Sequence, residues 1–391
     1  MQKLKIAMLT HSVNPRGGVV HALELAEALH DLGHDVSLIA PAELGKDLFR
    51  PVRCKTVLIP LMGLAGDLVA TVGQRIQAYV DYFVHSNRED YDIYHAQDAI
   101  SGCALAELKQ AGMIRTFIRT VHHLDRFDDD RLNAWQTASF LAADYVLCVS
   151  RLWQDRLLQD YGIAAQLINN GVDTRRFNPL PHANDEALRR LLGLNRGGPV
   201  FLAVGGVERR KNTLRICQAF RQLLRQRPDA QLVIAGGASL LDHDDYRRRF
   251  AVELAASGIA DGPGQPLLVT GPLPDADLPP LFRLADALVF PSLTEGFGLV
   301  VLEAIASGTP VVVSDRPPFT GYLRRDDGVW CDPERVDSIA GAMLAAAETF
   351  PRSRLPAIAE RLAAEYSWQR SAQTHLNHYR SLFATQGTAH A

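Results

Sequence analysis

The sequence predicts an α/β protein made of two halves, each a parallel β-sheet flanked by helices. Two observations predict this class. Short apolar runs alternate with longer stretches of helical spacing, which is typical of βαβ units, and the alternation pauses at 184–198 before it restarts at 199. The chain of 391 residues is long enough for two or three domains, and its 47% hydrophobic and 22% charged residues are typical of globular proteins.

In the first half, the apolar run at 5–10 is expected to be the first strand and 18–34 the first helix. Leu25, Ala28 and Leu29 would share one face of that helix, which Gly33 would end. Further strands, with helical stretches between them, are predicted at 35–40, 91–97, 115–122 and 144–150.

The same cycle restarts in the second half, after a short helix at 184–194, and the halves would join near 171–184. Ligands bind beyond the carboxyl ends of the strands in open parallel sheets, so we expect two half-sites that face each other across a cleft. Strands are predicted at 199–206, 230–237, 266–273, 286–292 and 309–315, and helices at 212–226 and 368–383.

The composition argues against several classes of function. The 41 Lys and Arg residues are outnumbered by 44 Asp and Glu, so a nucleic-acid partner is not expected. The five cysteines form no C-x-x-C pair, which disfavours zinc and disulfides and fits a reducing compartment. There is no 18-residue apolar stretch and no leader-like N-terminus, and the helical stretch at 67–88 lacks a basic face. We therefore expect a cytoplasmic protein with at most weak peripheral membrane contact.

Glycines follow the first strand of each half: Gly17 and Gly18, then Gly205 and Gly206. Glycine permits a close backbone approach, and the N-terminus of the helix that follows can bind a phosphate. A tight turn without a ligand explains the same residues. Neither loop matches G-x-G-x-x-G or a P-loop, so a nicotinamide cofactor is not favoured.

Arg209, Arg210 and Lys211 place three positive charges between a strand and the start of a helix. Cations at this position oppose the helix dipole unless an anion lies nearby. Both types of side chain bind phosphate oxygens. A solvated run of charges is the alternative, but the pattern favours an anion site.

The segment P-S-L-T-E-G-F-G-L-V-V-L-E contains the most specific pattern. Glu295 would lie in a glycine-containing loop and Glu303, eight residues later, on the helix that follows, so both can face one ligand. The N–H groups of Phe297, Gly298 and Leu299 would point outward toward that ligand. A glutamate at the edge of a packed helix is the alternative interpretation of Glu303.

His122 and His123 end a predicted strand of the first half. A histidine at a strand end can bind a hydroxyl or transfer a proton, although a buried histidine bonded to the backbone is the commoner case. Only one of the two can face the ligand if the chain is extended. The acidic run at 128–130 is interpreted as a solvated loop or helix start, so no metal ligand is predicted.

Taken in order, these motifs resemble the retaining GT-B glycosyltransferases of family 4 (glycosyl transferases group 1). Glu295 and Glu303 match the E-x7-E motif of that family, and the resemblance covers nearly the whole chain. The other matching pieces are the G-G loop at 17–18, T-V-H at 120–122, N-N-G-V-D-T-R-R-F-N-P at 169–179, the loop at 204–212, E-G-F-G, A-x-x-S-G-T-P-V and Y-S-W-Q at 366–369.

The resemblance implies two Rossmann-like domains. Residues 1–180 would form the acceptor-side domain, to which a final helix at about 368–385 crosses back, and 181–367 would form the donor domain. The donor would be a nucleotide sugar linked to UDP, GDP or ADP, with Glu303 on its ribose. Catalytic roles would fall to His122, Glu295, Arg210 and Lys211, and donor binding to Gly17, Gly18, Gly205, Gly206, Arg209, Phe297, Gly298, Leu299 and Glu303.

Two positions depart from the family pattern. Many members have Arg where this chain has Gly206, and Gly where it has Asn212. The role of that arginine would then shift to Arg209 or Arg210, of which we favour Arg210.

These roles describe a retaining transferase that moves a hexosyl group to a hydroxyl of a sugar, a lipid-linked glycan or a small metabolite. Fixed cations would stabilise the diphosphate leaving group, so no metal or other cofactor is expected. A nucleotide-sugar epimerase, a phosphorylase-like enzyme and a non-catalytic nucleotide-sugar-binding subunit are the alternatives. No lysine follows Lys211, which leaves little room for a pyridoxal lysine in the second half. The sequence does not predict an oligomeric state.

Overall fold

The computed structural model describes residues 3–63, 66–85, 90–194, 197–237 and 244–387. The chain forms two compact units. Unit 1 consists of Met1–Gly171 and Tyr366–Ala391, and unit 2 consists of Val172–Glu365. Each unit contains one sheet in which every strand pair is parallel, which confirms the predicted fold class.

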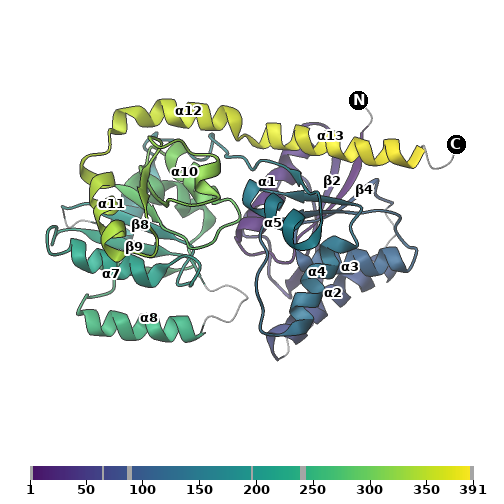
Figure 1. Ribbon diagram of the computed structural model, residues 1–391, viewed down its shortest axis with the longest axis horizontal. Helices are drawn as coiled ribbons and strands as arrows, with labels where there is room; N and C mark the ends of the chain where they lie inside the picture. Colours follow the sequence, from purple (N-terminus) through teal and green to yellow (C-terminus); the bar gives the residue numbers. More distant parts are fainter. Residues whose placement is uncertain (1–2, 64–65, 86–89, 195–196, 238–243, 388–391) are drawn as a thin grey trace. The chain divides into compact units, whose positions relative to one another are not determined.

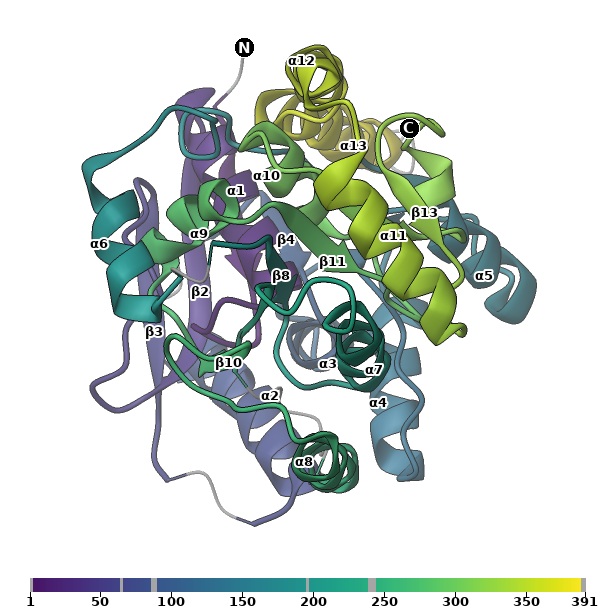
Figure 2. The ribbon, with the colours of Figure 1, turned by 90° about the vertical axis from the view of Figure 1, so that its left-hand side faces the viewer.

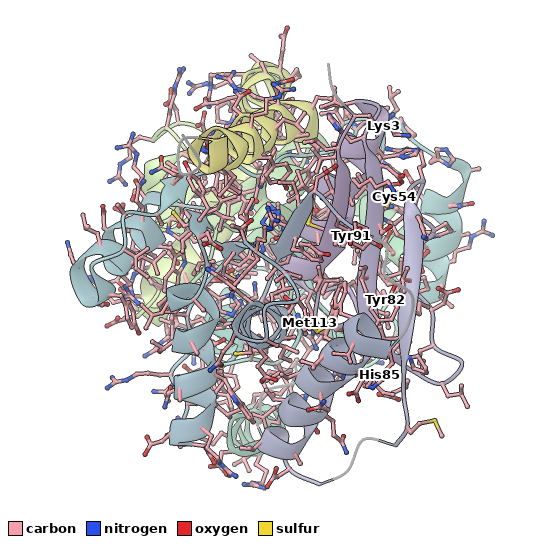
Figure 3. The ribbon with its side chains drawn as sticks, turned by 90° about the vertical axis from the view of Figure 1, so that its right-hand side faces the viewer. Lys3, Cys54, Tyr82, His85, Tyr91 and Met113 are labelled. Carbon is pink, nitrogen blue, oxygen red and sulfur yellow. The ribbon has the colours of Figure 1, made fainter. Side chains whose placement is uncertain are left out.

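The sheet of unit 1 has seven strands in the order β3-β2-β1-β4-β5-β6-β7. Figure 3 shows β3 as the outer strand, with Cys54 labelled just before it and α2, which carries Tyr82 and His85, beside it. The strands are β1 (Lys5–Leu9), β2 (Asp35–Glu43), β3 (Lys55–Leu61), β4 (Ile93–Ala96), β5 (Ile118–Val121), β6 (Tyr145–Cys148) and β7 (Gln166–Leu167). The helices are α1 (Gly17–Asp31), α2 (Leu68–His85), α3 (Ala99–Gln110), α4 (Asp130–Leu141), α5 (Arg151–Tyr161) and α13 (Trp368–Gly387).

Helices cover both faces of the unit 1 sheet, as βαβ connections require. Helices α1 and α13 pack together on one face, and α2, α3 and α4 lie on the other (Figure 1). The apolar faces of α2 and α3 close a core against β1, in which Ile76, Tyr79 and Leu105 are buried. Asp98 caps α3 by accepting a hydrogen bond from the Ser101 N–H at 2.9 Å, which fixes where the chain leaves β4.

The sheet of unit 2 has six strands in the order β10-β9-β8-β11-β12-β13. Helices α7 and α11 pack side by side on one face, where Phe220 and Met343 are fully buried, and α9 and α10 lie on the other (Figure 2). The strands are β8 (Val200–Val204), β9 (Gln231–Ala235), β10 (Leu267–Gly271), β11 (Ala287–Phe290), β12 (Val311–Ser314) and β13 (Val329–Cys331). The helices are α6 (Ala183–Leu192), α7 (Thr213–Leu223), α8 (Asp244–Ser257), α9 (Leu278–Leu284), α10 (Leu299–Ala306), α11 (Val336–Glu348) and α12 (Leu355–Glu365).

The strand order fixes where ligands can bind in each unit. It reverses between β1 and β4 in unit 1 and between β8 and β11 in unit 2. In open α/β sheets, the crevice at such a switch point, beyond the carboxyl ends of the strands, is where ligands bind. Candidate ligand-binding loops are therefore those after β8 and β11 in unit 2 and those after β1 and β4 in unit 1.

The first unit ends earlier than the domain boundary predicted at 180/181. Residues 172–180 belong to unit 2 because their side chains pack there: Arg176 pairs with Asp275 at 2.6 Å, and Phe177 meets the ring of Phe282. The final helix, α13, belongs to unit 1, and its first residue lies against Gly171, the last residue of the first segment of that unit. A Cβ on Gly171 would lie 2.3 Å from the Trp368 nitrogen, so the two segments touch backbone to backbone.

Three further features follow from the described residues. All five cysteines are buried and free, as their spacing predicts. No helix in the described part of the chain is both long and apolar enough to cross a membrane. Every strand expected from the sequence is present, whereas β3, β7 and β13 were not predicted.

Candidate functional site

A buried cluster of charges lies at the switch point of unit 2, where the loops after β8 and β11 meet. Lys211 Nζ donates to Glu295 Oε1 at 2.6 Å, and Arg210 Nη1 approaches the same oxygen at 3.3 Å. A backbone hydrogen bond of 2.8 Å from Leu293 N–H to the Arg210 carbonyl ties the two loops together. The structure thus brings together three of the four predicted catalytic residues, all from unit 2.

Glu208 is a second carboxylate in this cluster, and it was not predicted. Its side chain is 1% exposed and pairs with Arg210 Nη2 at 3.0 Å, so the guanidinium spans Glu208 and Glu295. In the sequence Glu208 looks like one more member of a solvated run of charges. Only its burial distinguishes Glu208 from those charges. The burial of a loop residue cannot be predicted from periodicity, because loops have no regular spacing of buried positions.

Burial and pairing shift the titration of this cluster. Burial lowers the pKa of Lys211 to about 8, although the charge of Glu295 opposes that shift. Burial would raise the pKa of Glu295, but Lys211 and Arg210 together hold it below its usual range. Lys211 Nζ also lies 4.3 Å from the centre of the Phe290 ring, a cation–π contact. The cluster therefore holds an ionised carboxylate beside a lysine whose pKa is about 8.

The two glycines after β8 are explained by crowding. A Cβ on Gly205 would lie 2.8 Å from Lys211 Cε, so this glycine makes room for the lysine side chain. A Cβ on Gly206 would lie 2.7 Å from the Gly237 carbonyl oxygen, and the φ angle of Gly206 is 74°. An arginine at this position would be strained in this backbone, which accounts for the departure from the family pattern.

Asn212 replaces the glycine common in the family because it tolerates the same backbone. Its φ of 64° is left-handed, and asparagine is the side chain after glycine that adopts this region most readily. Asn212 Nδ2 also donates to the Pro291 carbonyl at 3.0 Å and to the Pro333 carbonyl at 2.6 Å. The substitution therefore adds two hydrogen bonds that fasten the start of α7 to the loops after β11 and β13.

Arg209 does not join the cluster. Its side chain is exposed, and no ion pair of this residue is found among the described residues. The sequence left open whether Arg209 or Arg210 takes the role of the family arginine, and of these two it is Arg210 that contacts Glu295.

The E-G-F-G loop leads into α10 as predicted. Gly298 is the N-cap of α10 with a φ of 92°, Phe297 is buried with its ring stacked on Tyr322, and Leu299 is the first residue of the helix. Glu303 lies one turn further along α10 and is 8% exposed. The first N–H groups of such a helix have no partner within the helix and can bind an anion.

Gly298→Ala is expected to destabilise unit 2 by about 1–3 kcal/mol. The left-handed φ strains any other residue, and the new Cβ would lie 2.8 Å from Phe319 Cε1. Thermal unfolding would measure this loss. Gly341→Ala on α11 is the matched control: its Cβ meets nothing within 4 Å, and alanine in a helix should stabilise by up to about 1 kcal/mol. Equal effects of the two changes would contradict the expected strain.

In unit 1, His122 follows β5, the strand next to β4 and so one strand away from the switch point. A Cβ on Gly18 would lie 3.3 Å from His122 Cδ2, so the first turn of α1 packs on the imidazole, while Gly17 has open space around it. His122 Nε2 lies 3.0 Å from the amide oxygen Oε1 of Gln97, which follows β4. Two predicted residues of unit 1, Gly18 and His122, are therefore in contact.

Three more histidines surround His122 and were not predicted. His21 on α1 packs edge-on against it with ring centres 4.7 Å apart, and the His375 ring lies 5.9 Å from that of His21 and 5.7 Å from that of His95. All three are fully buried. Burial lowers the pKa of His21 to about 4 and that of His375 to about 3, so both are neutral near pH 7. The sequence gave no signal for these three histidines, because a lone histidine on the apolar face of a helix or strand is typical of a core.

The neighbouring polar residues have other roles. His123 points outward, is 42% exposed and pairs with Asp125 at 3.0 Å, so His122 is the histidine that faces inward. In the acidic run, Asp129 caps α4 by accepting a hydrogen bond from the Arg131 N–H at 2.8 Å, as its interpretation as a helix start predicts. The described residues contain no group of three or more acidic, histidine or cysteine side chains suited to a metal ion.

Two family models match the chain. The model described as "Glycosyltransferase Family 4" matches residues 15–176, and the model described as "Glycosyl transferases group 1" matches residues 184–352. Together they cover both units. The fold and the two matched segments define a glycosyltransferase.

Relatives and solved structures extend the match over almost the full length. An uncharacterised glycosyltransferase of Methanocaldococcus jannaschii is 27% identical over 86% of this chain and 87% of its own. A D-inositol 3-phosphate glycosyltransferase of Corynebacterium urealyticum is 26% identical over 97% and 96%. Sucrose-phosphate synthase from Thermosynechococcus elongatus superposes with a TM-score of 0.78 at 22% identity over 98% and 100%. Anabaena HepE in complex with UDP-glucose superposes with a TM-score of 0.73 at 19% identity over 98% and 100%. The chain belongs to the group 1 (family 4) glycosyltransferases, enzymes of the GT-B fold.

Proposed function

We propose that this enzyme transfers a hexosyl group, with retention of configuration, from a nucleoside-diphosphate sugar to a hydroxyl acceptor and without a metal ion. The observation that carries the proposal is the cluster of half-buried Arg210, largely buried Lys211 and buried Glu295 at the switch point of unit 2. Glu303 lies on the helix that starts from the same loop. In this proposal the cations bind the diphosphate, Glu295 binds the sugar and Glu303 binds the ribose.

The charges of the cluster suit the leaving group. When the bond between the sugar and the phosphate breaks, its electron pair goes to the diphosphate and the sugar carbon becomes cation-like. Fixed cations stabilise the diphosphate as its charge develops, which is the task that a metal ion performs in other enzymes. Glu295 would hold the hydroxyls of the transferred sugar, and the amides at the start of α10 would bind phosphate oxygens.

The identity of the donor is supported by the named neighbours. HepE is described in complex with UDP-glucose, and a starch synthase IV of similar fold is described as bound to ADP. We propose that the donor of this chain belongs to the same class, with UDP, GDP and ADP as the candidate nucleotides. Glu303 would bind the ribose hydroxyls, which all three share.

We propose that His122, in unit 1, binds a hydroxyl of a substrate. Burial, with smaller contributions from the charges of His21 and Arg119, holds the pKa of His122 well below its usual range, so it is a neutral imidazole at pH 7. A neutral ring can accept a hydrogen bond from a hydroxyl of the donor sugar or the acceptor.

A thermal-shift screen with UDP, GDP, ADP and their sugars, with and without EDTA, tests the proposal. Binding to the folded state alone raises stability by about 2.7 kcal/mol at 100 times the dissociation constant. We expect one nucleotide family to raise the Tm equally with and without EDTA. Glu303→Gln should abolish the shift, and Glu360→Gln, an exposed glutamate of α12, should keep it. No shift with any nucleotide would reject the donor assignment, and a shift lost in EDTA would reject metal independence.

A further inference from the structure

Gln97 makes a hydrogen bond that defines the protonation of His122. Its amide oxygen, Oε1, lies 3.0 Å from His122 Nε2. An amide oxygen only accepts hydrogen bonds, so the imidazole nitrogen must carry the proton and donate it. In a neutral imidazole the other nitrogen, Nδ1, is then a bare acceptor.

The orientation of this amide is fixed from its other side. Gln97 is 1% exposed, and its Nε2 donates to Met8 Sδ at 3.0 Å and lies 3.2 Å from His95 Nε2. A reversed amide would put its oxygen against the thioether sulfur, which has no proton to give. His95 is itself held by the Tyr379 hydroxyl of α13 at 2.7 Å and by Thr120 Oγ1 at 2.7 Å.

We propose that Gln97 is a positioning residue that holds neutral His122 with the proton on Nε2 and thereby leaves Nδ1 as the acceptor for a substrate hydroxyl. Gln97 acts through His122 and need not touch the substrate. The catalytic importance of this orientation rests on the proposed function, whereas the protonation of the ring does not. The buried chain from Tyr379 through His95 to Gln97 explains why a glutamine, with one donor and one acceptor end, suits this position.

The charges around His122 determine how a variant should behave. The imidazole is faced by His21 from α1, by His95 from β4, by Arg119 from β5 and by His123 from its own loop. All of these disfavour a second proton on the ring, and burial does so most strongly. A carboxylate in place of the Gln97 amide would stabilise the imidazolium and raise the pKa of His122. Because the second proton occupies Nδ1, it removes the proposed acceptor as the pH falls.

The test combines NMR with a pH profile. Protein with ¹⁵N-labelled histidine is titrated, and the His122 signals are assigned by their loss in His122→Gln. We expect Nε2 to carry the proton in the wild type, and both tautomers to be populated in Gln97→Met. Gln97→Glu should keep the proton on Nε2 but gain the second proton at a higher pH than the wild type does. Observation of the Nδ1–H form in the wild type would overturn the proposal.

Kinetics then test whether the orientation matters. Gln97→Met should lower kcat/KM about 10- to 100-fold, by analogy with the outer partners that orient metal-bound histidines. Gln97→Glu should move the acid limb of kcat/KM to higher pH. Gln166→Glu, an exposed glutamine of β7 with the same change of charge, should leave that limb in place. If the acid limbs of kcat/KM in Gln97→Glu and Gln166→Glu coincide, the proposal is also overturned. If the wild type transfers no sugar, the proposed function fails, while the NMR titration still decides the role of Gln97.

Discussion

Lys211→Met is expected to lower kcat/KM for sugar transfer about 10²- to 10³-fold, the usual loss when one fixed donor to a developing anion is removed. The ammonium lies 2.6 Å from Glu295 Oε1, and the Lys211 side chain is 13% exposed. Methionine has similar length and can keep the contact with the Phe290 ring, so the loss would reflect the missing charge. Steady-state kinetics with the donor found by thermal shift would measure it.

Lys46→Met is the matched control, because Lys46 is exposed just after β2 and lies outside the site. It should retain wild-type kcat/KM. The affinity for the nucleoside diphosphate should also fall in Lys211→Met, since in the proposed mechanism this product carries the charge that the lysine stabilises. A variant that keeps full transfer activity would show that Arg210 alone supports the leaving group, and it would remove Lys211 from the mechanism.

Local sequence patterns predicted the secondary structure well, because apolar spacing is dictated by the elements themselves. The strands that were not predicted have weak local patterns. β3 is an edge strand with Lys55 and Thr56 exposed, and β7 and β13 contain two and three residues. Segments as short as β7 and β13 are strands only because a neighbouring strand provides their hydrogen bonds, and a single sequence carries no record of that pairing.

The site residues likewise fall into those with a local sequence signal and those without one. Lys211 and Glu295 were predictable because each lies in a loop whose glycines and charges are unusual for a plain turn. Glu208, His21 and Gln97 were not, because their significance comes from contacts across the fold. His21, for example, donates through Nδ1 to Asn170 at 2.6 Å, across 149 positions of sequence. The role of a buried polar side chain follows from its hydrogen-bond partner, and the fold, not the local sequence, determines that partner.

Glu295→Gln is expected to have the second large effect, on both stability and pH dependence. Removing one partner of a buried ion pair leaves the other charge uncompensated, which costs about 3 kcal/mol or more. Here Lys211 and Arg210 would face each other without the carboxylate that lies 2.6 Å and 3.3 Å from them. Thermal unfolding of Glu295→Gln and Lys211→Met, singly and combined, should show that the double variant is more stable than the sum of the two losses predicts. Additive losses would mean that the pair is not coupled.

The pH profile of kcat/KM gives a second test of Glu295→Gln, because the direction in which its alkaline limb should move can be predicted. The charge of Glu295 raises the pKa of Lys211, and burial still lowers it to about 8 in the wild type. In the proposed mechanism the lysine acts in its protonated form, so wild-type kcat/KM is expected to fall as the pH rises through about 8, since this ratio reports the free enzyme. Without the carboxylate the pKa of Lys211 drops further, and the alkaline limb should move to lower pH. A limb that stays in place or moves upward would show that some other group controls it. In Lys211→Met this limb should be absent altogether, because the group that titrates is gone.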